Sequence, residues 1–251
     1  MGQLAGKVAI ITGAGSGFGT GMAEAYVREG AKVIVADINA EAGERVAKAL
    51  GANAKAVTTD VANGASVQAM VKACVAHFGV PDVVINNAGT THRNQPLLQV
   101  DEQTFDRVFN VNVKSIYHMT HAVVPLMRER GKGGLIINVG STAGIRPRPG
   151  LVWYNSSKGA VNLMSKAMAV ELAPDKIRVN ALCPVMGATA LLEDFMGMPD
   201  TPENRARFLS TIPLGRMCEP KDMAAAAVFL ATEAAEFLTG LEMPIDGGRT
   251  I

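Results

Sequence analysis

Short runs of apolar residues alternate along this chain with longer segments in which apolar and polar residues recur at helical spacing. Runs this short have the length of strands, and a repeat of three to four residues marks one buried face of a helix. The pattern predicts strands over residues 8–12, 33–36, 56–59, 83–85, 135–139, 179–182 and 242–245. It predicts helices over residues 17–29, 40–50, 65–78, 102–130, 154–172 and 220–232.

The predicted strands are continuously apolar, which is typical of a parallel sheet covered on both faces. Strands that alternate with helices and cross over with the usual right hand build an open, doubly wound sheet. We therefore expect an α/β fold of the Rossmann type, with helices on both faces of a parallel sheet. The chain has 251 residues and no internal repeat or linker, so residues 1–251 are predicted to form a single dinucleotide-binding catalytic domain.

Residues 185–216 interrupt this alternation before the last helix and carry three prolines among several large apolar residues. A connection this long in a compact domain is usually functional. Ligands of open α/β sheets bind beyond the carboxyl ends of the strands, where this segment starts. We expect residues 185–216 to be a substrate lid; the alternative is a surface helical hairpin that only packs against the domain.

The composition restricts the partners. The net charge is +1, so the chain has no broad basic field for nucleic acid. Its longest apolar runs are far shorter than the roughly 20 residues of a membrane helix, and its first residues do not have the pattern of a signal peptide. We expect neither a nucleic-acid nor a membrane partner, and a cytoplasmic location.

Three widely spaced cysteines, Cys74, Cys183 and Cys218, favour reduced thiols over disulfides or a zinc site.

A glycine-rich loop, Thr12-Gly13-Ala14-Gly15-Ser16-Gly17-Phe18-Gly19, joins the first predicted strand to the first helix. Glycines let the backbone approach a pyrophosphate, and the helix then presents free N–H groups and its positive dipole end. No Gly-Lys-Ser/Thr follows, so the loop is not a Walker A motif. The position between strand and helix indicates a dinucleotide site.

Asp37 ends the second predicted strand, where an acidic side chain accepts hydrogen bonds from the adenosine ribose. It would repel a 2′-phosphate, and neither Ser16 nor Ile38 is basic, so the sequence favours NAD over NADP. The alternative is a capping or turn aspartate. Asp60 follows the third strand, at the expected adenine edge, and Asn86-Asn87-Ala88-Gly89 ends the fourth beside the cofactor.

Tyr154 and Lys158 are four residues apart in a predicted helix and therefore share one face. A nearby ammonium favours the phenolate and lowers the tyrosine pKa from its usual value near 10. Such a pair alone is weak evidence. Ser141 strengthens it, because it follows a strand that ends at the same edge of the sheet.

Together these motifs resemble the short-chain dehydrogenase/reductase family along almost the whole chain. The resemblance rests on Thr12-Gly13-x-x-x-Gly17-x-Gly19, Asn86-Asn87-Ala88-Gly89, Asn110-Val111-Asn112-Val113, Ser141, Tyr154-x-x-x-Lys158, Arg178-Val179-Asn180, Cys183-Pro184, Thr239-Gly240 and Asp246-Gly247-Gly248.

The resemblance implies roles for four catalytic residues. Tyr154 is the general acid/base for the substrate oxygen, and Ser141 steadies that oxygen. Lys158 holds the nicotinamide ribose and depresses the Tyr154 pKa, and Asn112 holds a water that links Lys158 to solvent. The resemblance also implies a homotetramer built through the long helix and the Tyr154 helix. An apolar stripe of Ile116, Met119, Val123 and Met127 could belong to that interface or to the core.

The predicted cofactor site comprises Gly13, Ser16, Gly17, Phe18, Gly19, Asp37, Ile38, Asp60, Val61, Asn87, Ala88, Gly89, Tyr154, Lys158, Pro184, Val185 and Thr189. One position departs from the family, which often has Gly after the proline where this chain has Val185. We expect the backbone beside the nicotinamide to follow a different path, with Thr189 still able to reach the carboxamide.

Candidate substrate residues flank the catalytic set: His92, Ser141, Arg148, Trp153 and Met186. One hypothesis is that His92, Arg146 or Arg148 binds an anionic group such as a carboxylate. The alternative is exposed loop charges, with Trp153 packing between subunits or against the lid. His118 and His121 lie three apart on a helix, but no third ligand is evident and no metal is expected.

The sequence thus favours an NAD-linked dehydrogenase or reductase that acts on a secondary alcohol, polyol, hydroxy acid or sugar-like compound and its ketone. A 3-oxoacyl thioester is the alternative substrate, although such reductions usually go with NADP and would contradict Asp37. A non-catalytic cofactor-binding regulator of this fold would have lost Tyr154 or Lys158, and both are present.

Overall fold

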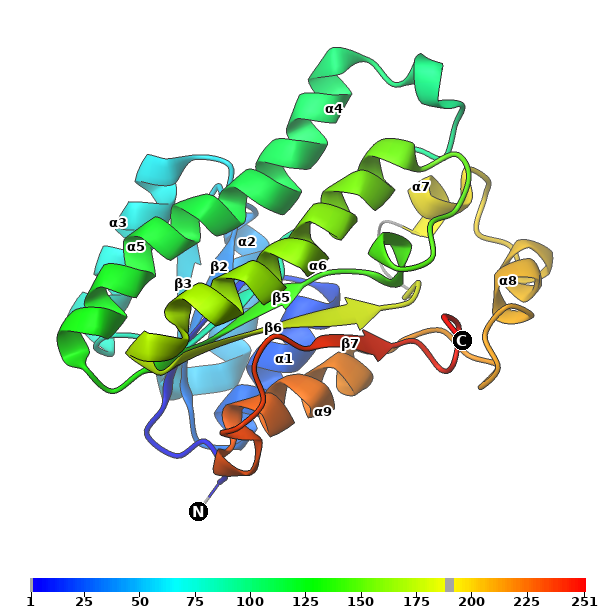
Figure 1. The fold of residues 1–251 in the computed structure, drawn as a ribbon. Coiled ribbons are helices and arrows are strands. Elements are labelled where there is room, and N and C mark those ends of the chain that lie inside the picture. The colour runs from blue at the N-terminus through cyan, green and yellow to red at the C-terminus, as the bar shows by residue number, and fades with distance from the viewer. Residues whose placement is uncertain (1, 188–191) are drawn as a thin grey trace.

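The protein is described by a computed structural model that covers residues 2–187 and 192–251. A seven-stranded sheet runs through its middle with helices on both faces (Figure 1). The strand order is β3-β2-β1-β4-β5-β6-β7, and every adjacent pair is parallel. The predicted doubly wound parallel fold is therefore confirmed.

The strands are β1 (Val8–Thr12), β2 (Lys32–Asp37), β3 (Ala54–Thr58), β4 (Val83–Asn86), β5 (Gly134–Val139), β6 (Ile177–Pro184) and β7 (Glu242–Ile245). The longer helices are α1 (Gly17–Arg28), α2 (Ala40–Leu50), α3 (Gly64–His77), α4 (Glu102–Phe109), α5 (Ser115–Arg130), α6 (Val152–Leu172) and α9 (Pro220–Ala231). Two short helices, α7 (Leu192–Met196) and α8 (Pro202–Leu209), lie in the expected lid segment.

The sequence predicts one helix from about residue 102 to residue 130, and the structure changes its winding in the middle. Between α4 and α5, residues Asn110–Lys114 form a π-helical segment. Such one-turn insertions occur mostly at functional sites because they re-aim a side chain. Here the segment carries the buried Asn112.

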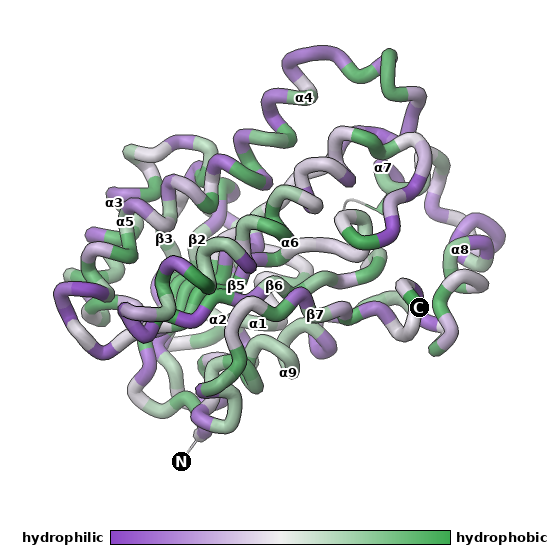
Figure 2. Tube along the Cα trace, viewed as in Figure 1, coloured by the Kyte–Doolittle hydropathy of each residue, from purple (hydrophilic) through white to green (hydrophobic). Residues whose placement is uncertain are grey.

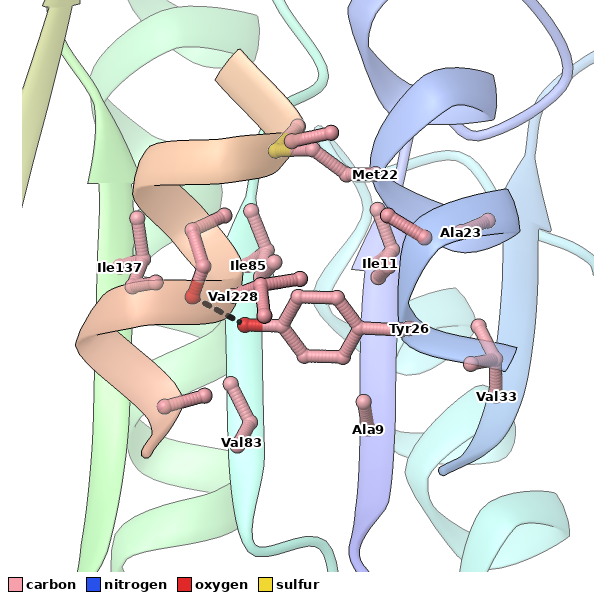
Figure 3. Close-up of a cluster of buried hydrophobic side chains, with 14 of the residues drawn as sticks. Ala9, Ile11, Met22, Ala23, Tyr26, Val33, Val83, Ile85, Ile137 and Val228 are labelled. Carbon is pink, nitrogen blue, oxygen red and sulfur yellow. Dashed lines mark hydrogen bonds between the residues drawn. The ribbon is translucent and has the colours of Figure 1, made fainter. Parts of the chain in front are cut away.

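Two hydrophobic clusters fill the space between the sheet and its helices. One packs β1, β2, β4 and β5 against α1, α2 and α9, and the other packs them against α3, α5 and α6. In the first cluster the Tyr26 ring lies between α1 and α9, and its hydroxyl donates a 2.8 Å hydrogen bond to the Ala227 carbonyl (Figure 3). Hydrophobic positions run along the strands, whereas α8 is mostly hydrophilic (Figure 2).

The predicted apolar stripe on α5 belongs to the core, because Ile116, Met119, Val123 and Met127 are all buried. Among the described residues, no helix combines the length and the apolar character needed to cross a membrane. The carboxyl ends of β6 and β7 point toward α8 and the C-terminal segment (Figure 1), and because the sheet is parallel the other strands end at the same edge.

Candidate active site

A cavity of about 880 Å³ lies at the carboxyl ends of the strands. Its walls come from the glycine-rich loop, the ends of β2 to β6, the start of α6, the helices α7 and α8, and the C-terminal segment. This volume is typical of a cofactor and substrate site. One half lies at the β2 and β3 edge of the sheet, and the other lies around Tyr154.

The glycine-rich loop presents its backbone to the cavity. Gly13 and Gly17 have φ angles of 62° and 54°, a conformation that favours glycine. Ser16 precedes α1 without capping it through its side chain. The first N–H groups of the helix are therefore available to an anion, and the loop fits a pyrophosphate.

Gly19 is predicted to be part of the cofactor site, but in the structure it does not line the cavity. It packs behind the loop, where an added Cβ would lie 2.1 Å from the Gly13 oxygen. Its role is therefore to let α1 approach the loop closely.

Asp37 lies at the edge of the cavity, and its carboxylate already accepts hydrogen bonds from the backbone. Its Oδ2 accepts the Gly15 N–H at 2.8 Å and its Oδ1 accepts the Asn39 N–H at 2.9 Å. Each carboxylate oxygen keeps acceptor capacity, so the turn role and a ribose-binding role are compatible. The neighbouring Ile38 is 70% exposed, and Asp60 and Val61 complete this end of the cavity.

Asn87 braces the loop from the end of β4. Its Nδ2 donates to the carbonyl oxygens of Thr12 and Gly13, at 2.8 and 3.1 Å. The Thr12 hydroxyl accepts the N–H groups of Asn87 and Ala88, both at 3.0 Å. Asn87, Ala88 and Gly89 line the cavity as predicted.

Tyr154, Lys158 and Ser141 line the other half of the cavity. Tyr154 and Lys158 lie on α6, and the Lys158 Nζ is 6.0 Å from the centroid of the Tyr154 ring. Ser141 follows β5, and its Oγ accepts the Ala143 N–H at 3.0 Å. All three residues are buried. The sequence prediction that these side chains share one site thus agrees with their placement in the structure.

Burial is the main influence on the pKa values of Tyr154 and Lys158. It raises the pKa of Tyr154, while the Ser141 side chain and then the Arg148 charge act to lower it. Burial also lowers the pKa of Lys158 to about 8. Arg148 supplies a positive charge that acts to lower the Tyr154 pKa. The expected effect of Lys158 on the same pKa stays a prediction. The Lys158 Nζ donates to the Val139 carbonyl at 2.8 Å.

Asn112 connects two segments of the site through hydrogen bonds. Its Oδ1 accepts the Thr90 N–H at 2.8 Å, and its Nδ2 donates to the Thr90 carbonyl and to the Ser157 hydroxyl. Both Nδ2 hydrogens are therefore used within the protein. The predicted water-holding role of Asn112 remains a prediction for its remaining acceptor sites.

Two predicted substrate residues lie outside the cavity lining. His92 is buried beneath α6, where its Nε2 accepts the Tyr154 N–H at 3.4 Å and its Nδ1 faces the Arg93 carbonyl at 2.8 Å. Trp153 packs edge-on against Phe105 and donates from Nε1 to the Leu97 carbonyl at 3.3 Å. Neighbouring helical residues point about 100° apart, so Trp153 faces away from the side on which Tyr154 lies. Both residues position α6.

The end of β6 and the loop after it bring Pro184, Val185 and Met186 to the cavity. Gly187 pairs with Cys218 and lies so close to the Phe18 ring that an added Cβ would be 2.4 Å from it. Thr189, predicted to reach the carboxamide, lies outside the described residues.

Arg146, one of the residues expected to bind an anionic group, also lines the cavity. Further lining residues were not assigned from the sequence: Thr59, Thr90, Asn94, Arg107, Val111, Val139, Gly140, Thr142, Ala143, Pro149, Gly187, Phe195, Arg207, Phe208, Thr211, Ile212, Arg249 and Thr250. Phe195 lies 4.9 Å from Tyr154 between ring centroids, edge to face. The apolar composition of residues 185–216 signalled Phe195 and Phe208. No local pattern pointed to Arg249.

The family model described as enoyl-(acyl carrier protein) reductase matches residues 13–250. The chain is 48% identical to the 4-formylbenzenesulfonate dehydrogenase of Comamonas testosteroni, over 98% of both proteins. It is 35% identical to a sorbitol dehydrogenase of Cereibacter sphaeroides, again over 98% of both. A crystal structure of 3-ketoacyl-(acyl-carrier-protein) reductase from Brucella melitensis complexed with NADH is similar, with a TM-score of 0.93, 46% identity, and coverage of 99% of this chain and 100% of that one.

Proposed function

The chain belongs to the short-chain dehydrogenase/reductase family, and from this premise we propose that it interconverts a secondary alcohol and its ketone with NAD(H). It is an oxidoreductase, as are the relatives that it matches along their whole length. The single observation that carries the proposal is the shared cavity of Tyr154, Ser141 and Lys158 with the glycine-rich loop and Asp37.

The side chains divide the work of the reaction. A bound nicotinamide supplies the hydride acceptor or donor. In alcohol oxidation Tyr154 takes the proton of the substrate hydroxyl, and in ketone reduction it returns that proton to the oxygen. Ser141 donates a hydrogen bond to the same oxygen as negative charge develops on it. The hydrogen bonds from Lys158 to β5 and from Asn112 to Ser157 hold the start of α6, and therefore Tyr154, in place.

NAD(H) is favoured over NADP(H) by the β2 end of the cavity. The Asp37 carboxylate would repel a 2′-phosphate, and the exposed side chain after it is the apolar Ile38. The arginines among the described lining residues come from the opposite side of the sheet, beyond β4. The related reductase of known structure was crystallised with NADH.

A 3-oxoacyl thioester is the second candidate substrate, favoured by the name of that structural relative. The test is a steady-state assay with NAD and NADP, using secondary alcohols, polyols and hydroxy acids in one direction. The other direction uses their ketones and the N-acetylcysteamine thioester of 3-oxobutanoate. The proposal expects NAD-dependent oxidation of an alcohol that Tyr154→Phe abolishes. Turnover of the thioester alone would assign the second function.

We also propose a homotetramer. Tyr117 of α5 and Leu163 and Val170 of α6 are large apolar residues exposed to 54%, 70% and 79%. Exposed apolar side chains on neighbouring helices favour burial against another copy of the chain. Sedimentation velocity would measure the assembly, and a monomer at micromolar concentration would contradict it.

A further inference from the structure

Five arginines line the cavity, and each comes from an element that follows β4 along the chain: Arg107, Arg146, Arg148, Arg207 and Arg249. They come from α4, from the loop after β5, from α8 and from the segment after β7, so the fold collects them from distant parts of the chain. The carboxylates that line the same cavity, Asp37 and Asp60, follow β2 and β3 at the other edge of the sheet. The substrate half is therefore cationic, although the whole chain has a net charge of only +1.

Ion pairs among the described residues do not neutralise this charge, although the Asp246 carboxylate favours the charged form of Arg249. In the part of the chain that the structure describes, none of the five forms an ion pair with a carboxylate, whereas Arg128, Arg130, Arg205 and Arg216 each do. Arg107 donates instead to the Thr90 hydroxyl and the Thr91 carbonyl, and Arg146 donates to the Arg249 carbonyl. Arginines that converge on a cavity without forming ion pairs to carboxylates are typical of sites for carboxylate or other oxyanions.

Arg148 lies close to the catalytic helix α6 and to α8. Its carbonyl accepts the Asn155 side-chain N–H at 2.8 Å, which ties the loop to α6 beside Tyr154. Its guanidinium lies 5.5 Å from the centroid of the Phe208 ring on α8. Burial lowers the pKa of Arg148, and the positive charge of Arg249 lowers it further. Two cations held near each other in a partly desolvated cavity repel, and an anion bound between them relieves that repulsion.

We propose that Arg148 and Arg249 form an anion subsite and that the substrate is an alcohol or ketone carrying a carboxylate or sulfonate group. This inference rests on the proposed function and names its substrate class. Phe195 lies against the Tyr154 ring, Phe208 lies against the Arg148 guanidinium, and Met186 belongs to the same apolar cluster as Phe208. Aromatic and thioether side chains favour a planar apolar body. The geometry therefore fits a hydroxyl at Tyr154, an apolar middle and an anionic end at the arginines.

The first test uses one carbon skeleton with four end groups. The wild-type enzyme is assayed with NAD and α-methylbenzyl alcohol, and with its para-carboxylate, para-sulfonate and para-trimethylammonium derivatives. A charge-assisted hydrogen bond predicts that at least one anionic alcohol has a kcat/KM about tenfold or more above that of the neutral parent. The cationic alcohol should be the poorest. A neutral parent that equals or exceeds both anions would overturn the inference.

Variants then assign the preference to residues. Arg148→Gln and Arg249→Gln should each reduce the ratio of anionic to neutral kcat/KM, whereas Arg148→Lys should keep part of it. Arg205→Gln is the matched control, because Arg205 lies on α8 but pairs with Asp200 and does not line the cavity. The ratio isolates anion recognition from any effect of Arg148 on Tyr154. An unchanged ratio in both glutamine variants would overturn the assignment.

A binding measurement separates this inference from the proposed function. Para-toluenesulfonate has no alcohol to oxidise, and calorimetry can titrate it into protein saturated with NADH. Binding that Arg148→Gln weakens about tenfold or more would support the subsite even if no alcohol were turned over, in which case only the proposed function would fail. Turnover of neutral alcohols without binding of para-toluenesulfonate or benzoate would retain the function and reject the subsite.

Discussion

The Nζ of Lys158 donates a 2.8 Å hydrogen bond to the carbonyl of Val139, the last residue of β5. Ser141 follows Val139 by two residues, so this bond ties α6 to the strand that presents the serine. The lysine is buried, and a buried ammonium loses hydration that one hydrogen bond does not restore. The site therefore maintains its geometry at a cost in folding free energy.

Replacing this lysine should make that cost visible. The pKa of Lys158 falls from 10.5 to about 8 on burial, so the unfolded chain binds more protons than the folded one between these values. Lys158 therefore destabilises the fold below about pH 8, and the penalty disappears as the pH rises toward 10.5. Lys158→Met should raise the free energy of unfolding at pH 7 by about 1–3 kcal/mol while activity is lost. Urea unfolding of both proteins at pH 7 and pH 10 measures this, and a gain that persists undiminished at pH 10 would contradict it.

The elevated pKa of Tyr154 predicts the pH dependence of the two directions. Because alcohol oxidation needs the phenolate, its kcat/KM should rise as the pH rises above neutrality, and ketone reduction should be fastest below that range. Arg148 acts to lower this pKa, so Arg148→Gln should move the rising limb of the oxidation profile to higher pH. Tyr154→Phe should reduce kcat by about 10² or more without loss of NADH binding. A wild-type profile that is flat over pH 6–10 would exclude Tyr154 as the base.

The cofactor preference should depend on two adjacent residues. Asp37→Ser with Ile38→Arg removes the carboxylate and adds a cation at the β2 end of the cavity. We expect the ratio of kcat/KM for NADP to that for NAD to rise about 100-fold, because the carboxylate no longer repels the 2′-phosphate and the new guanidinium attracts it. Ile38→Arg alone is the control and should give a smaller rise, because Asp37 would still repel the phosphate. Equal ratios in wild type and double variant would place the discrimination elsewhere.

Gly19 predicts a steric test of the glycine-rich loop. A Cβ at residue 19 would lie 2.1 Å from the Gly13 oxygen, so Gly19→Ala must separate α1 from the loop. We expect weaker NADH binding, measured by fluorescence titration, and a lower melting temperature. Gly43→Ala is the control, since its Cβ would meet its nearest neighbours at an ordinary 3.7 Å and alanine favours the helix. Normal cofactor binding in Gly19→Ala would contradict the close-packing role.

The sequence predicted the parts of the molecule that local patterns encode. The bounds of β1, α2 and β7 agree with prediction, because glycines, asparagine and the ends of apolar runs mark them. The residues predicted to form the site lie at strand ends and helix starts: the loop glycines, Asp37, and Tyr154 with Lys158. A parallel α/β sheet brings these positions to one edge, so the fold class alone predicts that they share a site.

Side-chain direction and distant contacts were harder to predict. Trp153 is adjacent to Tyr154 but faces Phe105, and His92 turns inward to accept the Tyr154 N–H. Arg249 reaches the cavity only because the segment after β7 folds back to it. The π-helical turn at Asn110–Lys114 changes the helical period too little to be seen in the apolar pattern.

That π-helical turn leads to the last prediction. Asn112 joins the loop after β4 to α6 through three hydrogen bonds, two to Thr90 and one to Ser157. Asn112→Ala should lower the free energy of unfolding by about 1–3 kcal/mol, because it leaves the partly buried Thr90 N–H and carbonyl without their partner. If Asn112 acts on catalysis by positioning α6, kcat should fall in Asn112→Ala and recover partly in Asn112→Gln, with the pH profile unchanged. A shifted pH profile would instead favour a role in proton transfer to solvent, because only that role makes the titration of Lys158 and Tyr154 depend on residue 112.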